Sequence, residues 1–210
     1  MSTNSASLPR RPYELGKRLE LMDQTRAAVL QAARNQLESK GYRQLTMSSL
    51  AAESGVTRQT IHNLFGTKSA ILEALFDVIA LDGGMERMRQ VMTQPSPDAM
   101  LQGFIEVFCR FWSSNRLLLR RVHGIGAIDP EFGAVIQARN RRRFTAAQRI
   151  AGQITTGKNI SGQAQEKAAA LTALTSFEFF DALAENSVSE ERAVSLILEM
   201  AQKLFAISPR

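Results

Sequence analysis

The sequence predicts an all-α fold with about nine helices, on three observations. Ala, Leu, Arg, Gln and Glu are plentiful, whereas 13 glycines and 6 prolines are spread thinly over 210 residues, and such a composition favours helices. Apolar residues recur at intervals of three and four, and no strand-like alternation is present. With 44% apolar residues, the chain is long enough to bury the core of one large domain or two smaller ones.

The N-terminal third begins with a segment of low apolar content. Residues 1–21 are Ser/Pro-rich and then basic, which predicts a flexible arm carrying Arg10, Arg11, Lys17 and Arg18. From Asp23 the apolar spacing becomes helical and continues to Gly41, a residue that commonly ends helices. A short helix is then expected over 47–54, a second over 58–64 and a third over 68–80.

The two short helices carry the most informative spacing. Helices that cross steeply through a tight turn need a small residue at the crossing, a turn residue that tolerates positive φ, and a branched apolar residue facing inward. Ala51, Gly55 and Ile61 meet these needs in order, and Thr57 offers a capping hydroxyl for the second helix. The spacing therefore predicts a helix-turn-helix.

The remaining residues predict longer helices. After Gly83-Gly84 we expect helices over 98–114, 115–124, 129–154, 162–185 and 189–205, the second ended by Gly124 and Gly126. Pro130 suits the first position of its helix, and Ser189 suits an N-cap.

The segment from Gly41 to Leu72, with its signature Thr60-Ile61-x-x-x-Phe65-x-x-Lys68, resembles the DNA-binding domain of the tetracycline-repressor (TetR) family. The resemblance covers about 22–80 and implies a helix-turn-helix DNA-binding domain there, with a ligand-binding and dimerisation domain over 81–210. It further implies a cytoplasmic homodimer that binds double-stranded DNA at a near-palindromic operator, with half-sites about one turn (~34 Å) apart, and a repressor that an unknown small-molecule effector releases.

Arg58–Leu64 is then the recognition helix. Its N-terminal Arg58 and Gln59 suit base edges in the major groove, since Arg pairs with guanine and Gln with adenine. The expected DNA contacts, to bases or phosphates, are Thr46, Ser48, Thr57, Arg58, Gln59, Thr60, His62, Asn63 and Lys68. The resemblance also implies an effector pocket, for which we expect Phe104, Phe108, Trp112, His123, Phe144 and Phe177. For the dimer interface we expect Leu171, Leu174, Phe177, Val194, Ile197, Leu198, Ala201 and Leu204.

Charge and composition bear on partners and cofactors. The net charge of +6 favours a polyanionic partner, and residues 10–68 carry ten Lys/Arg against five acidic residues. The basic stretch Arg139–Arg143 is interpreted as a solvated or ion-paired helix face rather than a second nucleic-acid patch. One cysteine (Cys109) and two distant histidines (His62 and His123) predict no disulfide, no metal site and no cofactor. No apolar run is long enough for a membrane span.

Two other functions are an enzyme and a helical protein that binds a partner other than DNA. An enzyme would need converging carboxylates or a Glu-x-x-His motif, and neither is visible, so we expect no enzyme. A partner-binding helical protein whose helix-turn-helix no longer binds DNA stays open, because Leu64 offers no hydrogen bond to a phosphate.

Overall fold

The structure, a computed structural model, describes residues 11–155, 161–186 and 189–206. All regular structure in these ranges is helical, with eleven α-helices and two 3₁₀ turns. The predicted all-α fold is confirmed, although the expected number of about nine helices was too low. The chain divides into two units between Ile71 and Leu72.

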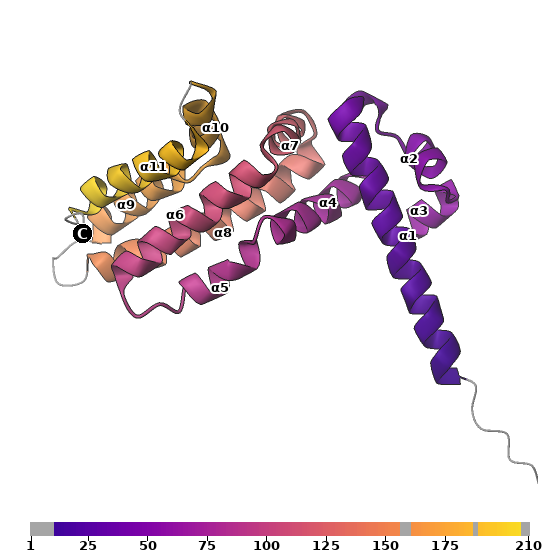
Figure 1. Cartoon of the computed structure of the whole chain (residues 1–210), viewed down its shortest axis with the longest axis horizontal. Helices are drawn as coiled ribbons and strands as arrows, with labels where there is room; N and C mark the ends of the chain where they lie inside the picture. Colours follow the sequence, from indigo (N-terminus) through magenta and orange to yellow (C-terminus); the bar gives the residue numbers. More distant parts are fainter. Residues whose placement is uncertain (1–10, 156–160, 187–188, 207–210) are drawn as a thin grey trace, which may run out of the picture. The chain divides into compact units, whose positions relative to one another are not determined.

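The first unit consists of α1 (Arg11–Ser39), the 3₁₀ turn η1 (Tyr42–Gln44), α2 (Met47–Ser54), α3 (Arg58–Phe65) and the first residues of α4 (Lys68–Asp82) (Figure 1). In its core α1 packs against α2, and α2 against α3. Fully buried side chains come from all three helices, namely Val29, Ala33, Leu37, Leu50 and Ile61, and also from Leu45 after η1 and Ile71 in α4.

Helix α1 begins at Arg11, so residues 11–21 are helical where the sequence predicts a flexible arm. Leu, Glu, Lys and Arg dominate this stretch and lose little side-chain freedom in a helix, which accounts for the longer α1. Residues 1–10 of the predicted arm, with Arg10, lie outside the described residues.

The second unit contains the rest of α4, one 3₁₀ turn and seven further α-helices. In chain order they are η2 (Met85–Arg87), α5 (Met88–Val91), α6 (Pro97–Ser114), α7 (Arg116–Ile128), α8 (Pro130–Ile154), α9 (Ser161–Leu174), α10 (Phe177–Glu185) and α11 (Glu190–Phe205). Helix α8 packs against α6, α7 and α9, and α6 packs against α5 and α11. Figure 1 shows α6, α8, α9 and α11 side by side. Among the described residues, no helix combines the length and apolarity that crossing a membrane requires.

The helix predicted over 162–185 is broken, which corrects that expectation. It ends at Leu174, and Ser176 caps a new helix by accepting a hydrogen bond from the backbone N–H of Phe179. The break exposes the carbonyl oxygen of Thr175 to two side chains. It accepts hydrogen bonds from Trp112 Nε1 (3.0 Å) and Arg143 Nη1 (3.1 Å). Tertiary partners for this carbonyl therefore replace the intrahelical bond that it would otherwise make.

Helix α7 also differs from the prediction, because it runs through Gly124 and Gly126 to Ile128. Instead of ending the helix, Gly126 allows α8 to approach closely. A Cβ atom added at Gly133 of α8 would lie 2.5 Å from the carbonyl oxygen of Gly126. The two glycines thus fix the spacing of α7 and α8.

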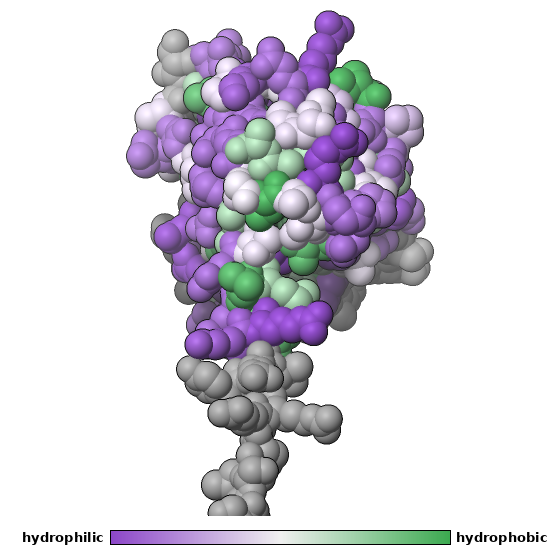
Figure 2. Space-filling view, turned by 90° about the vertical axis from the view of Figure 1, so that its right-hand side faces the viewer, coloured by the Kyte–Doolittle hydropathy of each residue, from purple (hydrophilic) through white to green (hydrophobic). Residues whose placement is uncertain are grey.

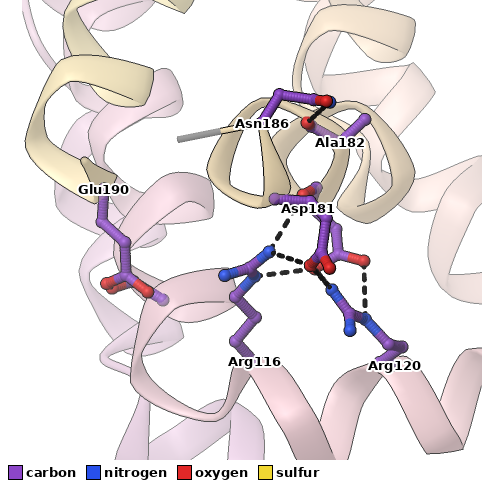
Figure 3. A network of polar contacts seen from close by, with 8 residues as sticks. Arg116, Arg120, Asp181, Ala182, Asn186 and Glu190 are labelled. Carbon is purple, nitrogen blue, oxygen red and sulfur yellow. Dashed lines mark hydrogen bonds and ion pairs between the residues drawn. The ribbon is translucent and has the colours of Figure 1, made fainter. Parts of the chain in front are cut away.

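Arg116 and Arg120 of α7 form ion pairs with Asp181 and Glu185 of α10, a cluster that we call the clasp (Figure 3). Arg120 binds both carboxylate oxygens of Asp181, at 2.8 and 2.9 Å, and Arg116 Nε binds the same carboxylate at 2.7 Å. Glu185 accepts from both arginines. Burial alone would raise the pKa of Asp181, but the hydrogen bonds from Arg120 and Arg116 outweigh it and the pKa is lowered. The clasp holds α10 directly after the break at Thr175.

Candidate nucleic-acid interface and ligand cavity

The turn between α2 and α3 has the geometry that its sequence predicts. Gly55 ends α2 with φ 71° and ψ 20°, a left-handed conformation that is costly for residues with a Cβ atom. Thr57 then caps α3, accepting from the backbone N–H of Thr60. Ile61 is fully buried and Ala51 is half-buried. This turn projects α3 from the unit as a separate short helix.

A buried glutamine on α1 positions α2. The side chain of Gln36 is 1% exposed, its Nε2 donates to Glu53 at 3.0 Å, and its Oε1 accepts from Ser49 Oγ at 2.8 Å. Ser49 lies in the first turn of α2 and Glu53 near its end, so one side chain holds both ends of the helix. Sequence reasoning missed Gln36. Its position among the apolar residues Ala33 and Leu37 was the available signal.

The outer face of α3 is polar and exposed. The exposed side chains are those of Arg58, Gln59, His62 and Asn63, and Thr60 is half-buried. Gln59 Nε2 donates to Asn63 Oδ1 at 2.9 Å, which aligns the two amides along the helix. Figure 2 shows the side of the molecule that carries α1–α3, whose surface is mostly hydrophilic with small apolar areas. Cationic and amide groups on one helix face can hydrogen-bond base edges or phosphates.

The other predicted DNA-contacting residues have local roles as well. Thr46 and Thr57 are N-caps, and their hydroxyls are engaged with Ser49 and Thr60. Ser48 is exposed in the first turn of α2. Lys68 Nζ lies 3.4 Å from the centroid of the Tyr42 ring and donates to the Tyr42 carbonyl at 3.3 Å. The structure therefore fixes the Lys68 ammonium beside η1.

A cavity of about 280 Å³ lies within the second unit, between α4, α5, α6, α7 and α8. Four of the six predicted pocket residues line it: Phe104, Phe108, Trp112 and His123. Phe177 packs against Trp112 and His123, with ring centroids 5.6 and 4.7 Å apart, without lining the cavity. Phe144 lies instead at a separate shallow hollow beside α9. Most of the remaining wall is apolar and includes Phe76, Met85 and Met88.

His123 closes one end of the cavity. Its Nδ1 lies 2.9 Å from Glu178 Oε1, and its side chain is 11% exposed. The hydrogen bond with His123 lowers the pKa of Glu178 to about 2, against a smaller opposing effect of burial. His123 thus lies in the cavity wall, whereas its role in effector binding stays a prediction.

The interpretation of the basic stretch on α8 as a solvated or ion-paired face holds for Arg139, which is ion-paired, and for Arg141 and Arg142, which are exposed, but not for the buried Arg143. Arg139, Arg142 and Arg143 all line the cavity. Arg139 pairs with Asp77 at 2.6 Å, but Arg143 is only 7% exposed and forms no ion pair with a described carboxylate. Burial lowers the pKa of Arg143 to about 10, while Glu178 acts in the opposite direction. Arg139 and Arg143 face inward because they continue an inner stripe of α8 that includes Phe132 and Ala147.

The described residues offer neither a candidate metal site nor a reactive cysteine. Across residues 11–155, 161–186 and 189–206, no three His, Cys, Asp or Glu side chains are grouped as metal ligands would be. Cys109 is fully buried, and burial, with Glu106 nearby, raises the pKa of its thiol to about 12. Its thiolate, the reactive form, is therefore strongly disfavoured.

Comparisons with known proteins match the helix-turn-helix directly. Residues 29–75 match the sequence model of the bacterial regulatory proteins of the tetR family. The chain is 36% identical over 134 residues to the transcriptional regulator AlkX of Mycobacterium tuberculosis, covering 61% of each chain. It is 29% identical over 112 residues to the regulator EthR of Mycolicibacterium smegmatis, covering 52% of this chain and 51% of EthR. Residues 29–75 therefore carry the DNA-binding segment of the tetR family, and the chain is similar to two transcriptional regulators.

A solved structure extends the likeness to the whole fold. A TetR transcription regulator from Haloarcula marismortui superposes with a TM-score of 0.67 over 88% of this chain and 97% of its own, at 18% identity. The sequence matches span only about half to three-fifths of the two curated relatives. Proteins of the tetR family are DNA-binding transcriptional regulators and not enzymes.

The eight expected interface residues fall into two groups. Leu171, Phe177, Ile197 and Ala201 are at most 3% exposed and belong to the chain's own core. Leu174, Val194, Leu198 and Leu204 are half-exposed and retain apolar surface. Helical spacing predicted which residues form an apolar stripe, but it could not distinguish those buried in the chain's own core from those left exposed for a partner.

Proposed function

We propose that this chain is a dimeric, sequence-specific DNA-binding regulator of the tetR family that a small-molecule effector releases from its operator. The observation that carries the proposal is the exposed Arg58-Gln59 end of α3, held outward by the left-handed turn at Gly55. An α-helix fits the major groove of B-DNA, where an N-terminal Arg and Gln can each make two hydrogen bonds to one base.

The supporting residues divide by role. Arg58 and Gln59 are proposed to contact bases, and His62 and Asn63, further along the same exposed face, to contact bases or phosphates. Thr46, Ser48, Thr57 and Thr60 lie in the first turns of α2 and α3 or cap them, where free backbone N–H groups attract phosphate oxygens. Lys68 adds a positive charge at the start of α4.

The dimer and the effector complete the proposal. The half-exposed residues Leu174, Val194, Leu198 and Leu204 are proposed to pack against their copies in a second chain, forming a helix bundle about a two-fold axis. Such a dimer would present two recognition helices to a near-palindromic operator. The cavity is the proposed effector site. The effector releases DNA if it binds more tightly to a dimer conformation in which the spacing of the two recognition helices does not match the operator.

The test is a gel shift and footprint on the DNA flanking the chain's own gene. Arg58→Ala and Gln59→Ala should each cost roughly 1–3 kcal/mol of binding free energy and relax base preference at defined positions. Arg34→Ala removes the same charge as Arg58→Ala from α1, where Arg34 pairs with Glu38 at 3.1 Å, and should leave base preference intact. The proposal fails if no flanking fragment is protected, or if Arg34→Ala and Arg58→Ala behave alike.

A further inference from the structure

We infer that the cavity of the second unit binds a small carboxylic acid, with its carboxylate against Arg143 and a compact apolar body against the aromatic wall. This inference rests on the proposed effector role of the cavity and gives the chemical class of the effector.

The first argument is an incompletely paired buried cation. Arg143 is 7% exposed, and of its five N–H donors one is used by the Thr175 carbonyl. Its Nε atom is buried without a hydrogen-bond partner, and no described carboxylate forms an ion pair with it. The nearby carboxylate of Glu178 is engaged by His123 instead. Because a buried charge without a counter-ion is destabilising, an anionic ligand bound beside this guanidinium would be stabilised by it.

A second arginine repeats the arrangement one turn earlier on α8. Arg139 lies four residues before Arg143, so both side chains point to the same face of the helix. Its Nη2 binds Asp77 at 2.6 Å, its guanidinium lies 4.4 Å from the centroid of the Phe76 ring, and its Nε is also buried without a partner. None of the cavity-lining residues is acidic. The cavity is therefore positively charged.

The rest of the wall sets the size and character of the ligand. Phe104, Phe108, Phe111 and Trp112 form an apolar surface, and the Arg143 guanidinium lies 5.6 Å from the centroid of the Phe108 ring. Since a water molecule takes up about 30 Å³ in the liquid, the cavity of about 280 Å³ has room for roughly nine non-hydrogen atoms. Phenylacetate and octanoate are close to this size.

The anion is assigned as a carboxylate rather than a phosphate. A guanidinium edge pairs with the two oxygens of a planar carboxylate. A phosphate monoester would bring up to two charges, but Arg139 already pairs with Asp77 at 2.6 Å, so the buried Arg143 is left to receive a single negative charge, and a further unpaired charge would be costly beside the aromatic side of the wall.

The experiment is titration calorimetry on the full chain with phenylacetate, octanoate, their neutral amides and phenyl phosphate. In the unmodified protein each acid should bind at least tenfold more tightly than its amide. Arg143→Met should abolish this difference, and Arg143→Lys, which keeps the charge, should retain part of it. Arg141→Met is the matched control. Arg141 is exposed on the same helix and borders the hollow at Phe144 instead, so the preference for acids should not change.

The inference is overturned if acids and amides bind alike, if neither acid binds at millimolar concentration, or if phenyl phosphate binds more tightly than both acids. If circular dichroism shows that Arg143→Met does not fold, the inference is tested by comparing the binding of acids and amides in the unmodified protein and in Arg143→Lys. Calorimetry involves no DNA. Failure here with an intact gel shift therefore overturns the ligand assignment alone, and a failed gel shift with a clear preference for acids overturns the DNA-binding proposal.

Discussion

The close approach of α7 and α8 gives a stability prediction with a worked magnitude. In Gly133→Ala the new Cβ would lie 2.5 Å from the carbonyl oxygen of Gly126, whereas ordinary contacts are 3.4–4 Å. The neighbouring atom is backbone, so the helices must separate by nearly 1 Å. Overpacking of this kind costs about 1–3 kcal/mol, and the higher helix propensity of alanine returns up to about 1 kcal/mol. We expect Gly133→Ala to lower the free energy of unfolding by about 1–2 kcal/mol.

Gly152→Ala supplies the control on the same helix. A Cβ at Gly152 meets nothing within 4 Å, so only the gain in helix propensity remains, and the free energy of unfolding should rise by about 0.5–1 kcal/mol. Urea unfolding followed by the fluorescence of the single tryptophan measures both variants. If Gly133→Ala proves as stable as Gly152→Ala, α7 and α8 do not pack at this distance.

Two further predictions concern the carboxylates of α10. Asp181→Asn leaves two arginines of the clasp without their shared partner, one of them only 21% exposed, and should lower the free energy of unfolding by roughly 1–3 kcal/mol. Glu185→Gln, at a 62% exposed side chain, should lower it by clearly less than Asp181→Asn does; equal effects in urea unfolding would contradict the clasp. Glu178 has a folded pKa of about 2 against an ordinary 4.5, so its contribution is complete above pH 4.5 and is lost as the pH falls towards 2. Because the side chain is 69% exposed, we expect less than about 1 kcal/mol, and Glu178→Gln should flatten the pH dependence of stability in that window and nowhere else.

Local interactions made the helix-turn-helix predictable from sequence. The left-handed conformation of Gly55, the cap at Thr57 and the buried Ile61 are each set by residues within one or two turns. The ends of longer helices were less predictable because tertiary contacts set them. The N-cap Ser176 is a local signal for the break after Leu174, but the donors that bind the Thr175 carbonyl lie 63 and 32 residues away.

The cavity was predicted in part. Three of the expected lining residues, Phe104, Phe108 and Trp112, lie on α6 and do line the cavity, but the basic stretch of α8 was interpreted as a solvated or ion-paired face. A signal was available in the spacing of its arginines. The inward positions of α8 are separated by three or four residues, and they are Phe132, Ile136, Arg139, Arg143, Ala147 and Ile150. On a helix, an arginine that falls within an apolar stripe must face the same way as its neighbours.

The carbonyl of Thr175 connects the two proposals physically. It accepts from Trp112 on α6 and from Arg143 on α8, and it lies directly after Leu174, which is proposed to face the partner chain. Since this carbonyl uses one of the five N–H donors of Arg143, a carboxylate bound to the remaining donors would share the guanidinium with it and could shift the side chain that holds it. An effector could therefore alter the chain break between α9 and α10 through a single hydrogen bond, and the break adjoins the proposed dimer interface. Release of DNA would then require two arrangements of this bond that the ligand binds with different affinity, because a ligand with equal affinity for both shifts neither.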